Sequence, residues 1–241
     1  SITLSIADKI DTLTGFYGIN EKPSSSKDPY ALRRVALGII RIIVENKKNI
    51  KINDLFSYSQ NIYLSQGFEF SNNNLLKDIS NFLKDRFKYY LKEKNIRHDI
   101  IEAAHKILDL NNISTTHEKA KSLNKFINKK IGEDIIISYK RAFNILSSES
   151  KNQINDLSNT VDPGMFKNDF EKSLFIKTNE LKQYFSGITN NQNFDETLIL
   201  LSTAKDEVFN FLDNVKVNDD NEIIKKNRLE LLNFFCKTYE N

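Results

Sequence analysis

Four side chains that could bind a metal ion recur along one predicted helix face. His98, Glu102, His105 and Asp109 lie at positions i, i+4, i+7 and i+11. In a helix the two histidines are about 10 Å apart along the axis, whereas each protein ligand of a zinc ion lies only about 2 Å from it. The spacing therefore predicts a solvated polar face rather than a metal site.

Other residue types used in catalysis occur without suitable partners. Asp8 and Asp11 form an early carboxylate pair with no histidine beside it, and Cys236 falls among apolar residues of a predicted helix. The segment from Gly15 to Gly18 is too short and too aromatic to be a phosphate-binding glycine loop. We therefore expect no catalytic residue, no metal and no cofactor in this chain.

Charge is segregated along the chain, although its formal net charge is only +3. Residues 22–51 carry eight Lys or Arg against two acidic residues, and residues 119–141 carry seven against two. Residues 149–222 carry fourteen acidic residues against seven lysines. Such segregation can steer a polyanion to one side of a protein. Because lysine is abundant in this Asn- and Ile-rich chain, the seven arginines are the more informative cations.

A narrow polar stripe interrupts an otherwise apolar helix predicted over residues 29–46. Arg34, Gly38, Arg41 and Glu45 are spaced four, three and four residues apart and share one face. A stripe of this kind faces solvent, a buried carboxylate or a phosphate.

Arg228 lies near the apolar face of the last predicted helix. An arginine in that position usually forms a buried ion pair. We expect structural roles for Arg34, Arg41 and Arg228. The candidate partners of Arg228 are Asp213, Asp219 and Asp220.

Tyrosines next to lysine or arginine are the features most compatible with RNA binding. Cationic side chains bind phosphates, whereas aromatic rings stack on unpaired bases. The expected RNA contacts are Arg86, Lys88, Tyr89, Tyr90, Tyr139, Lys140 and Arg141. The expected additional phosphate contacts are Lys125, Lys129 and Lys130.

Helices must position these residues. Gly and Pro are scarce, at seven and three of 241 residues, and apolar side chains recur at helical spacing with no convincing strand pattern. Gly15 and Gly18 predict a turn after a helix over residues 2–13, and Asp28 with Pro29 predicts an N-cap and a first-turn proline. We expect an all-α multi-helix bundle. Further helices are predicted at 52–65, 73–94, 99–110, 116–130, 133–148, 165–186, 194–214 and 221–239.

Composition also restricts the expected location. No apolar run is long enough to span a bilayer, one cysteine cannot form a disulfide within the chain, and no leader pattern is seen. We expect a cytoplasmic protein. Because the helical pattern is already established near Ser1, we expect the chain to be part of a longer polypeptide.

Several segments together form a long and specific pattern. In the first part these are Ile6–Leu13, Gly15–Ile19, Lys22–Pro23 and Lys27–Arg34. Later ones are Asp85–Tyr90, Arg97–Ile101, Lys140–Leu146, Val161–Pro163, Val215–Val217 and Asn227–Leu232. The pattern resembles the C-terminal third of the β subunit of bacterial heterotetrameric glycyl-tRNA synthetase. Asn20 and Gly164 depart from it, because glycine and alanine are usual there.

The resemblance implies a division of labour within a glycine–tRNA ligase. The α subunit would hold the class II site that uses ATP and Mg, and the β subunit would bind tRNA for glycine in an α2β2 assembly. The segment from Phe194 onward resembles the helical anticodon-binding domain shared with arginyl-tRNA synthetases. The earlier region resembles the end of an HD-type domain, of which Asp8 would be the last acidic position.

This resemblance predicts two domains. Residues 1–110 would form a helical region with the end of the HD-type domain and connecting helices, and residues 111–241 the anticodon-binding-like domain. Two other functions stay open. A structural arm that holds subunits in register would bind RNA only nonspecifically, with a Kd of about 10⁻⁴ to 10⁻⁶ M. A remnant of an HD-type hydrolase would require a divalent metal and nucleotide turnover.

Overall fold

The computed structural model describes residues 1–48, 50–150, 160–187 and 193–240. Within these residues the regular structure is helical and includes no strand, which confirms the all-α class. Contacts divide the chain into two units, Ser1–Asn124 and Lys125–Asn241, and the division falls inside helix α6 (Ile113–Ile127). The domain boundary expected after residue 110 falls within the short 3₁₀ helix η1 (Leu110–Asn112).

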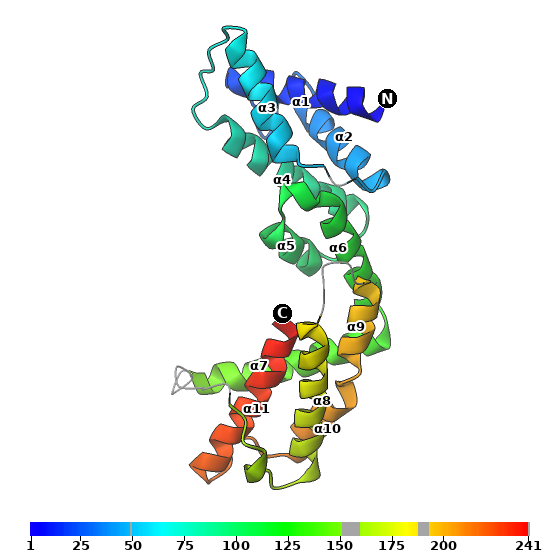
Figure 1. Cartoon of the computed structure of the whole chain (residues 1–241), viewed down its shortest axis with the longest axis vertical. Helices are drawn as coiled ribbons and strands as arrows, with labels where there is room; N and C mark the ends of the chain where they lie inside the picture. The colour runs from blue at the N-terminus through cyan, green and yellow to red at the C-terminus, as the bar shows by residue number, and fades with distance from the viewer. Residues whose placement is uncertain (49, 151–159, 188–192, 241) are drawn as a thin grey trace. The chain divides into compact units, whose positions relative to one another are not determined.

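The first unit is built around helix α4 (Figure 1). The α-helices that lie wholly within it are α1 (Ile2–Gly18), α2 (Leu32–Glu45), α3 (Ile52–Ser65), α4 (Leu75–Glu93) and α5 (His98–Ile107). Helix α4 packs against all four of the others, and α1 also packs against α2 and α3. Leu13, Ile39, Leu83 and Phe87 are fully buried at these contacts. The buried stripe of α4 leaves its opposite face at the surface.

The second unit places α11 (Glu222–Glu240) against α7 (Lys130–Ser150) and α8 (Asp169–Ser186) (Figure 1). Helix α10 (Lys205–Asn214) packs on the same two helices, and α9 (Phe194–Ser202) contacts α7. Phe211, Leu231 and Phe235 are fully buried there. The short 3₁₀ helix η3 (Pro163–Met165) precedes α8, so the helix expected from residue 165 begins at Asp169.

The first helix is longer than expected, because its glycines serve packing rather than a turn. Gly15 and Gly18 both lie inside α1. A Cβ on Gly15 would be 2.8 Å from the Tyr63 hydroxyl, and one on Gly18 would be 2.1 Å from the Phe70 ring. The sequence shows only that the side chain is missing, whereas the structure shows the rings that occupy its place.

The start of α2 also differs from the expected cap. The helix begins at Leu32, after Ala31 in the left-handed conformation with φ 54°, so Pro29 is not in its first turn. The Asp28 carboxylate still caps the helix, because its oxygens accept from the backbone N–H groups of Leu32 and Arg33 at 2.8 and 3.0 Å. The expected N-cap residue is therefore wrong, because Ala31 occupies that position, although the Asp28 side chain accepts hydrogen bonds from the first turn of the helix.

The single helix expected over residues 194–214 is divided into α9 and α10. The Ser202 and Thr203 hydroxyls donate to the carbonyls of Ile199 and Leu200 at 2.6 and 2.7 Å. Side-chain hydroxyls thus compete for carbonyls that a continuous helix would pair with backbone N–H groups. This local competition ends α9 at Ser202, although the apolar pattern of the sequence continues and suggested one helix.

Candidate nucleic-acid interface

The first group of expected RNA contacts lies on α4, next to α5. The Arg86 guanidinium carbon is 5.8 Å from the centre of the Phe82 ring and 5.7 Å from that of Tyr89, which is exposed. The Lys88 Nζ is 2.7 Å from Glu102 Oε1 on α5. These side chains, Phe82 apart, line a shallow groove of about 350 Å³. The aromatic and cationic surface is present, but the charge of Lys88 is already paired.

Tyr90 is not part of this surface. Only 2% of it is exposed, and its ring lies 6.5 Å from Phe87 and 5.6 Å from His117. Burial raises the pKa of the Tyr90 hydroxyl above its usual value. The prediction that Tyr90 contacts RNA is wrong, because the next helical position after Tyr89 points into the core.

The second expected group lies on α7. Tyr139 stacks on Phe143, with ring centres 6.2 Å apart and planes at 16°, and Phe143 is 48% exposed. The Arg141 Nη2 is 2.7 Å from Asp213 Oδ1 on α10. Lys140 is exposed, and in the described part of the chain no carboxylate lies within ion-pair distance of it. This helix thus carries an aromatic face and one cation, Lys140, that has no carboxylate partner among the described residues.

The expected phosphate contacts near the start of α7 differ in their pairing. Lys130 Nζ is 2.9 Å from Asp134 Oδ1, and this contact raises the pKa of the Lys130 ammonium. Lys125 and Lys129 are exposed, and no described carboxylate pairs with either. The charges of Lys125 and Lys129 are therefore not offset by a carboxylate of the described residues.

Arg228 forms a buried network that joins three segments of the second unit. Its Nε is 2.6 Å from Glu171 Oε1, and its Nη1 is 2.7 Å from Asp219 Oδ2 and 2.9 Å from the Lys216 carbonyl. Asp219 is one of the three expected partners. Glu171 was not anticipated, because it lies 57 residues earlier in the chain.

The polar stripe on α2 faces the surface. Arg34 and Arg41 are exposed, and Arg41 Nη2 is 3.2 Å from Glu93 Oε2. A Cβ on Gly38 would be 2.7 Å from the Lys9 Cε atom, so a flexible lysine covers the small residue in the stripe. The stripe therefore contains one exposed ion pair and no buried acid.

The helix face that carries His98, Glu102 and His105 does not bring these side chains together as a set of metal ligands. His98 Nε2 is 3.7 Å from Glu102, whereas His105 Nε2 is 3.7 Å from Asp85. Among the described residues there is no cluster of three or more His, Cys, Asp or Glu suited to a metal ion. Cys236 is buried, and no helix in the described ranges is long and apolar enough to cross a membrane.

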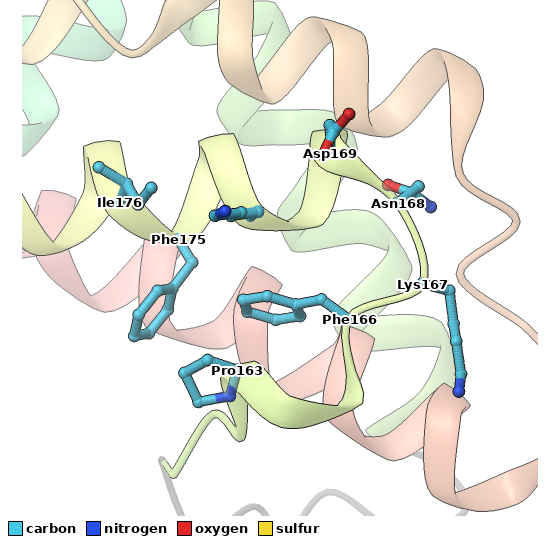
Figure 2. A pocket seen from close by; sticks show the side chains of 8 residues that line it. Pro163, Phe166, Lys167, Asn168, Asp169, Phe175 and Ile176 are labelled. Atoms are coloured by element: carbon cyan, nitrogen blue, oxygen red, sulfur yellow. The ribbon is translucent and has the colours of Figure 1, made fainter.

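A pocket of about 460 Å³ lies where α8 begins, in a region for which the sequence predicted no site. The Phe166 and Phe175 rings lie side by side with Pro163 next to them, and Lys167 extends away from the rings (Figure 2). Lys172 also lines the pocket. The sequence analysis missed these lysines because residues 149–222 have a net negative charge. The summed charge of a sequence range does not show which side chains share a surface.

A helical unit that presents aromatic rings and unpaired lysines is compatible with an RNA-binding domain, and the comparisons specify its class. Residues 135–241 match the family model of the DALR anticodon binding domain. Residues 1–106 match the family model of the glycyl-tRNA synthetase beta subunit. The chain belongs to the glycyl-tRNA synthetase β-subunit family.

Similar proteins of known name agree with this assignment. The glycine–tRNA ligase beta subunits of Rickettsia prowazekii (strain Madrid E) and Rickettsia bellii (strain OSU 85-389) are 36% and 38% identical to it, each over 98% of this chain. That of Ruegeria sp. (strain TM1040) is 33% identical over 96% of the chain. The matches cover 33%, 32% and 32% of those proteins, so the chain spans about a third of their length.

Proposed function

We propose that this chain is a noncatalytic, tRNA-binding part of a glycyl-tRNA synthetase β subunit. The match of residues 135–241 to an anticodon-binding domain carries the proposal. In this proposal the α subunit attaches glycine to its tRNA with ATP and Mg, in a cytoplasmic α2β2 assembly. The chain contributes tRNA binding and needs no cofactor of its own.

The surface chemistry of the second unit supports this role. Lys125, Lys129 and Lys140 are exposed cations without a described carboxylate partner, and phosphate binding by such groups releases counterions. Phe143, at 48% exposure, offers a ring face near Lys140 on the same helix. Cations and ring faces together suit a structured RNA that has an unpaired loop.

A second function, a structural arm with little RNA contact, is favoured by a different observation. Lys88, Lys130 and Arg141 each pair with a carboxylate of their own unit. The Lys88 and Arg141 pairs each join two helices, and all three pairs lower the charge available to RNA. The two functions predict different RNA specificity.

The test is a titration of the 241-residue chain with three RNAs over a series of salt concentrations. The RNAs are tRNA for glycine, the same tRNA with changed anticodon bases, and an unrelated tRNA. We expect the native glycine tRNA to bind about tenfold more tightly, a difference of about 1.4 kcal/mol. Equal, steeply salt-dependent binding to all three would instead support the structural arm.

A matched pair of variants tests the phosphate contacts. Lys140→Gln removes an unpaired cation, so we expect the slope of log K against log salt to fall by about 0.7 to 0.9. Lys130→Gln removes a cation already paired with Asp134 and serves as the control, with a smaller change expected. Equal effects of both substitutions would show that the ion pair does not decide which lysine binds phosphate.

A further inference from the structure

The pocket at the start of α8 combines apolar ring surface with positive charge. Phe166 and Phe175 are half-buried, with ring centres 5.6 Å apart and planes at 59° (Figure 2). Phe175 also lies 6.0 Å from Phe234, and the Lys182 Nζ lies 5.0 Å from the centre of that third ring. Aromatic faces that are partly open to solvent are suited to stacking on a base.

The cations at this pocket are not neutralised by the protein. Lys167 and Lys172 line the pocket, and Lys182 lies beside the neighbouring Phe234 ring. All three lysines are exposed, and none of them has an ion pair among the residues that the structure describes. Among the described residues, the only carboxylate lining the pocket is that of Asp169. The positive charge at the pocket therefore favours an anionic ligand, although the surrounding residues 149–222 have a net negative charge.

The segment that carries Phe166 is fixed in place by hydrogen bonds. The Asp162 backbone N–H donates to Asn227 Oδ1 on α11 at 2.8 Å, and the Asn227 side chain donates back to the Asp162 carbonyl at 3.0 Å. The backbone N–H groups of Lys167 and Asn168 donate to Glu171 Oε2 at 2.6 and 3.1 Å. The segment is thus held at both ends.

The buried ion pair completes this support. Arg228 Nε binds the other oxygen of Glu171 at 2.6 Å, so the carboxylate that holds the segment is itself held from α11. A site whose rings are positioned before binding loses less conformational entropy when a ligand arrives. This rigidity distinguishes the pocket from a chance gap between surface side chains.

We infer that this pocket binds an unpaired nucleobase of single-stranded RNA, which stacks on Phe166 and Phe175 while Lys172 and Lys182 contact the adjoining phosphates. The inference rests on the proposed function and specifies one of its contacts. An apolar partner protein would use the rings but would leave Lys172 and Lys182 without a role. An RNA loop uses both features.

The absence of tryptophan makes a direct test possible. Phe166→Trp introduces a single indole, and we expect its fluorescence to be quenched by an anticodon-loop RNA but not by a fully paired duplex of equal length. Phe170→Trp is the matched control, because Phe170 is 38% exposed on α8 but does not line the pocket. Quenching of the control alone would overturn the inference by placing the unpaired bases outside the pocket.

Affinity measurements with the full chain provide a second readout. Phe166→Leu and Phe175→Leu keep apolar volume but remove the ring face, and we expect tRNA binding to weaken by about fivefold to 150-fold. Lys172→Gln should lower the salt slope by about 0.7, whereas Lys177→Gln, whose lysine already pairs with Glu180, should lower it less. Unchanged thermal unfolding of each variant shows that the fold is retained.

The outcomes separate this inference from the function on which it depends. If the wild-type chain binds no tRNA, both fail. If it binds tRNA and the Phe166 and Phe175 variants bind equally well, the pocket is not a base site and the proposed function stands. If these variants bind tRNA normally but lose association with the α subunit, the pocket is a protein contact and the inference is wrong.

Discussion

At the level of single residues, two arginines of the second unit show how burial changes the value of an ion pair. Arg228 and Glu171 have side chains only 7% and 1% exposed, whereas those of Arg141 and Asp213 are 41% and 57% exposed. A buried charge that loses its partner remains desolvated and unpaired, while an exposed one is resolvated by water.

This difference predicts unequal effects of two arginine substitutions. We expect Arg228→Ala to lower the free energy of unfolding by about 3 to 5 kcal/mol, because Glu171 would be left buried without its cation. Arg141→Ala, the control, should lower it by about 0 to 1 kcal/mol. Urea unfolding of the two variants measures both values. Similar small losses would show that Glu171 is stabilised without Arg228.

At the level of elements, the glycines of α1 and α2 answer different requirements. Gly18 gives the Phe70 ring access to the α1 backbone, whereas Gly38 lies under the flexible end of Lys9. Glycine within a helix costs about 1 kcal/mol relative to alanine. Glycine is therefore favoured over alanine only where a rigid neighbouring side chain occupies the space that a Cβ would fill.

Two alanine substitutions distinguish these cases. We expect Gly18→Ala to destabilise the chain by about 1 to 3 kcal/mol, because the new Cβ would lie 2.1 Å from a ring carbon that cannot move freely. Gly38→Ala should stabilise it by up to about 1 kcal/mol, because Lys9 can turn aside. Denaturant midpoints report both signs. Destabilisation by Gly38→Ala would contradict the distinction.

At the level of the whole molecule, each of the two units has its own buried core. Leu13 and Phe87 lie in the core of Ser1–Asn124, and Phe211 and Phe235 in that of Lys125–Asn241. The charge is also distributed unequally along the chain. Charge sums over sequence ranges do not show which lysines lack a carboxylate partner, because pairing depends on the folded surface. We therefore expect stability to be changed in one unit at a time.

Calorimetry of the chain tests this independence. We expect two unfolding transitions, because chains with separate cores deviate from two-state unfolding. Gly18→Ala should lower the midpoint of one transition, and Arg228→Ala that of the other. A single transition lowered by both variants would show that the two cores unfold as one cooperative unit.

The sequence by itself determined the all-α class and the family, because apolar periodicity and contiguous motifs are local. The involvement of Asp28 in the start of α2 and the family motif Ile6–Leu13 both follow from the sequence without any knowledge of packing. Only the tertiary structure decided that Tyr89 is exposed and Tyr90 buried, that Glu171 holds Arg228, and that Phe166 and Phe175 share a pocket. The physical reason is that burial and charge pairing depend on side chains brought together from distant parts of the chain.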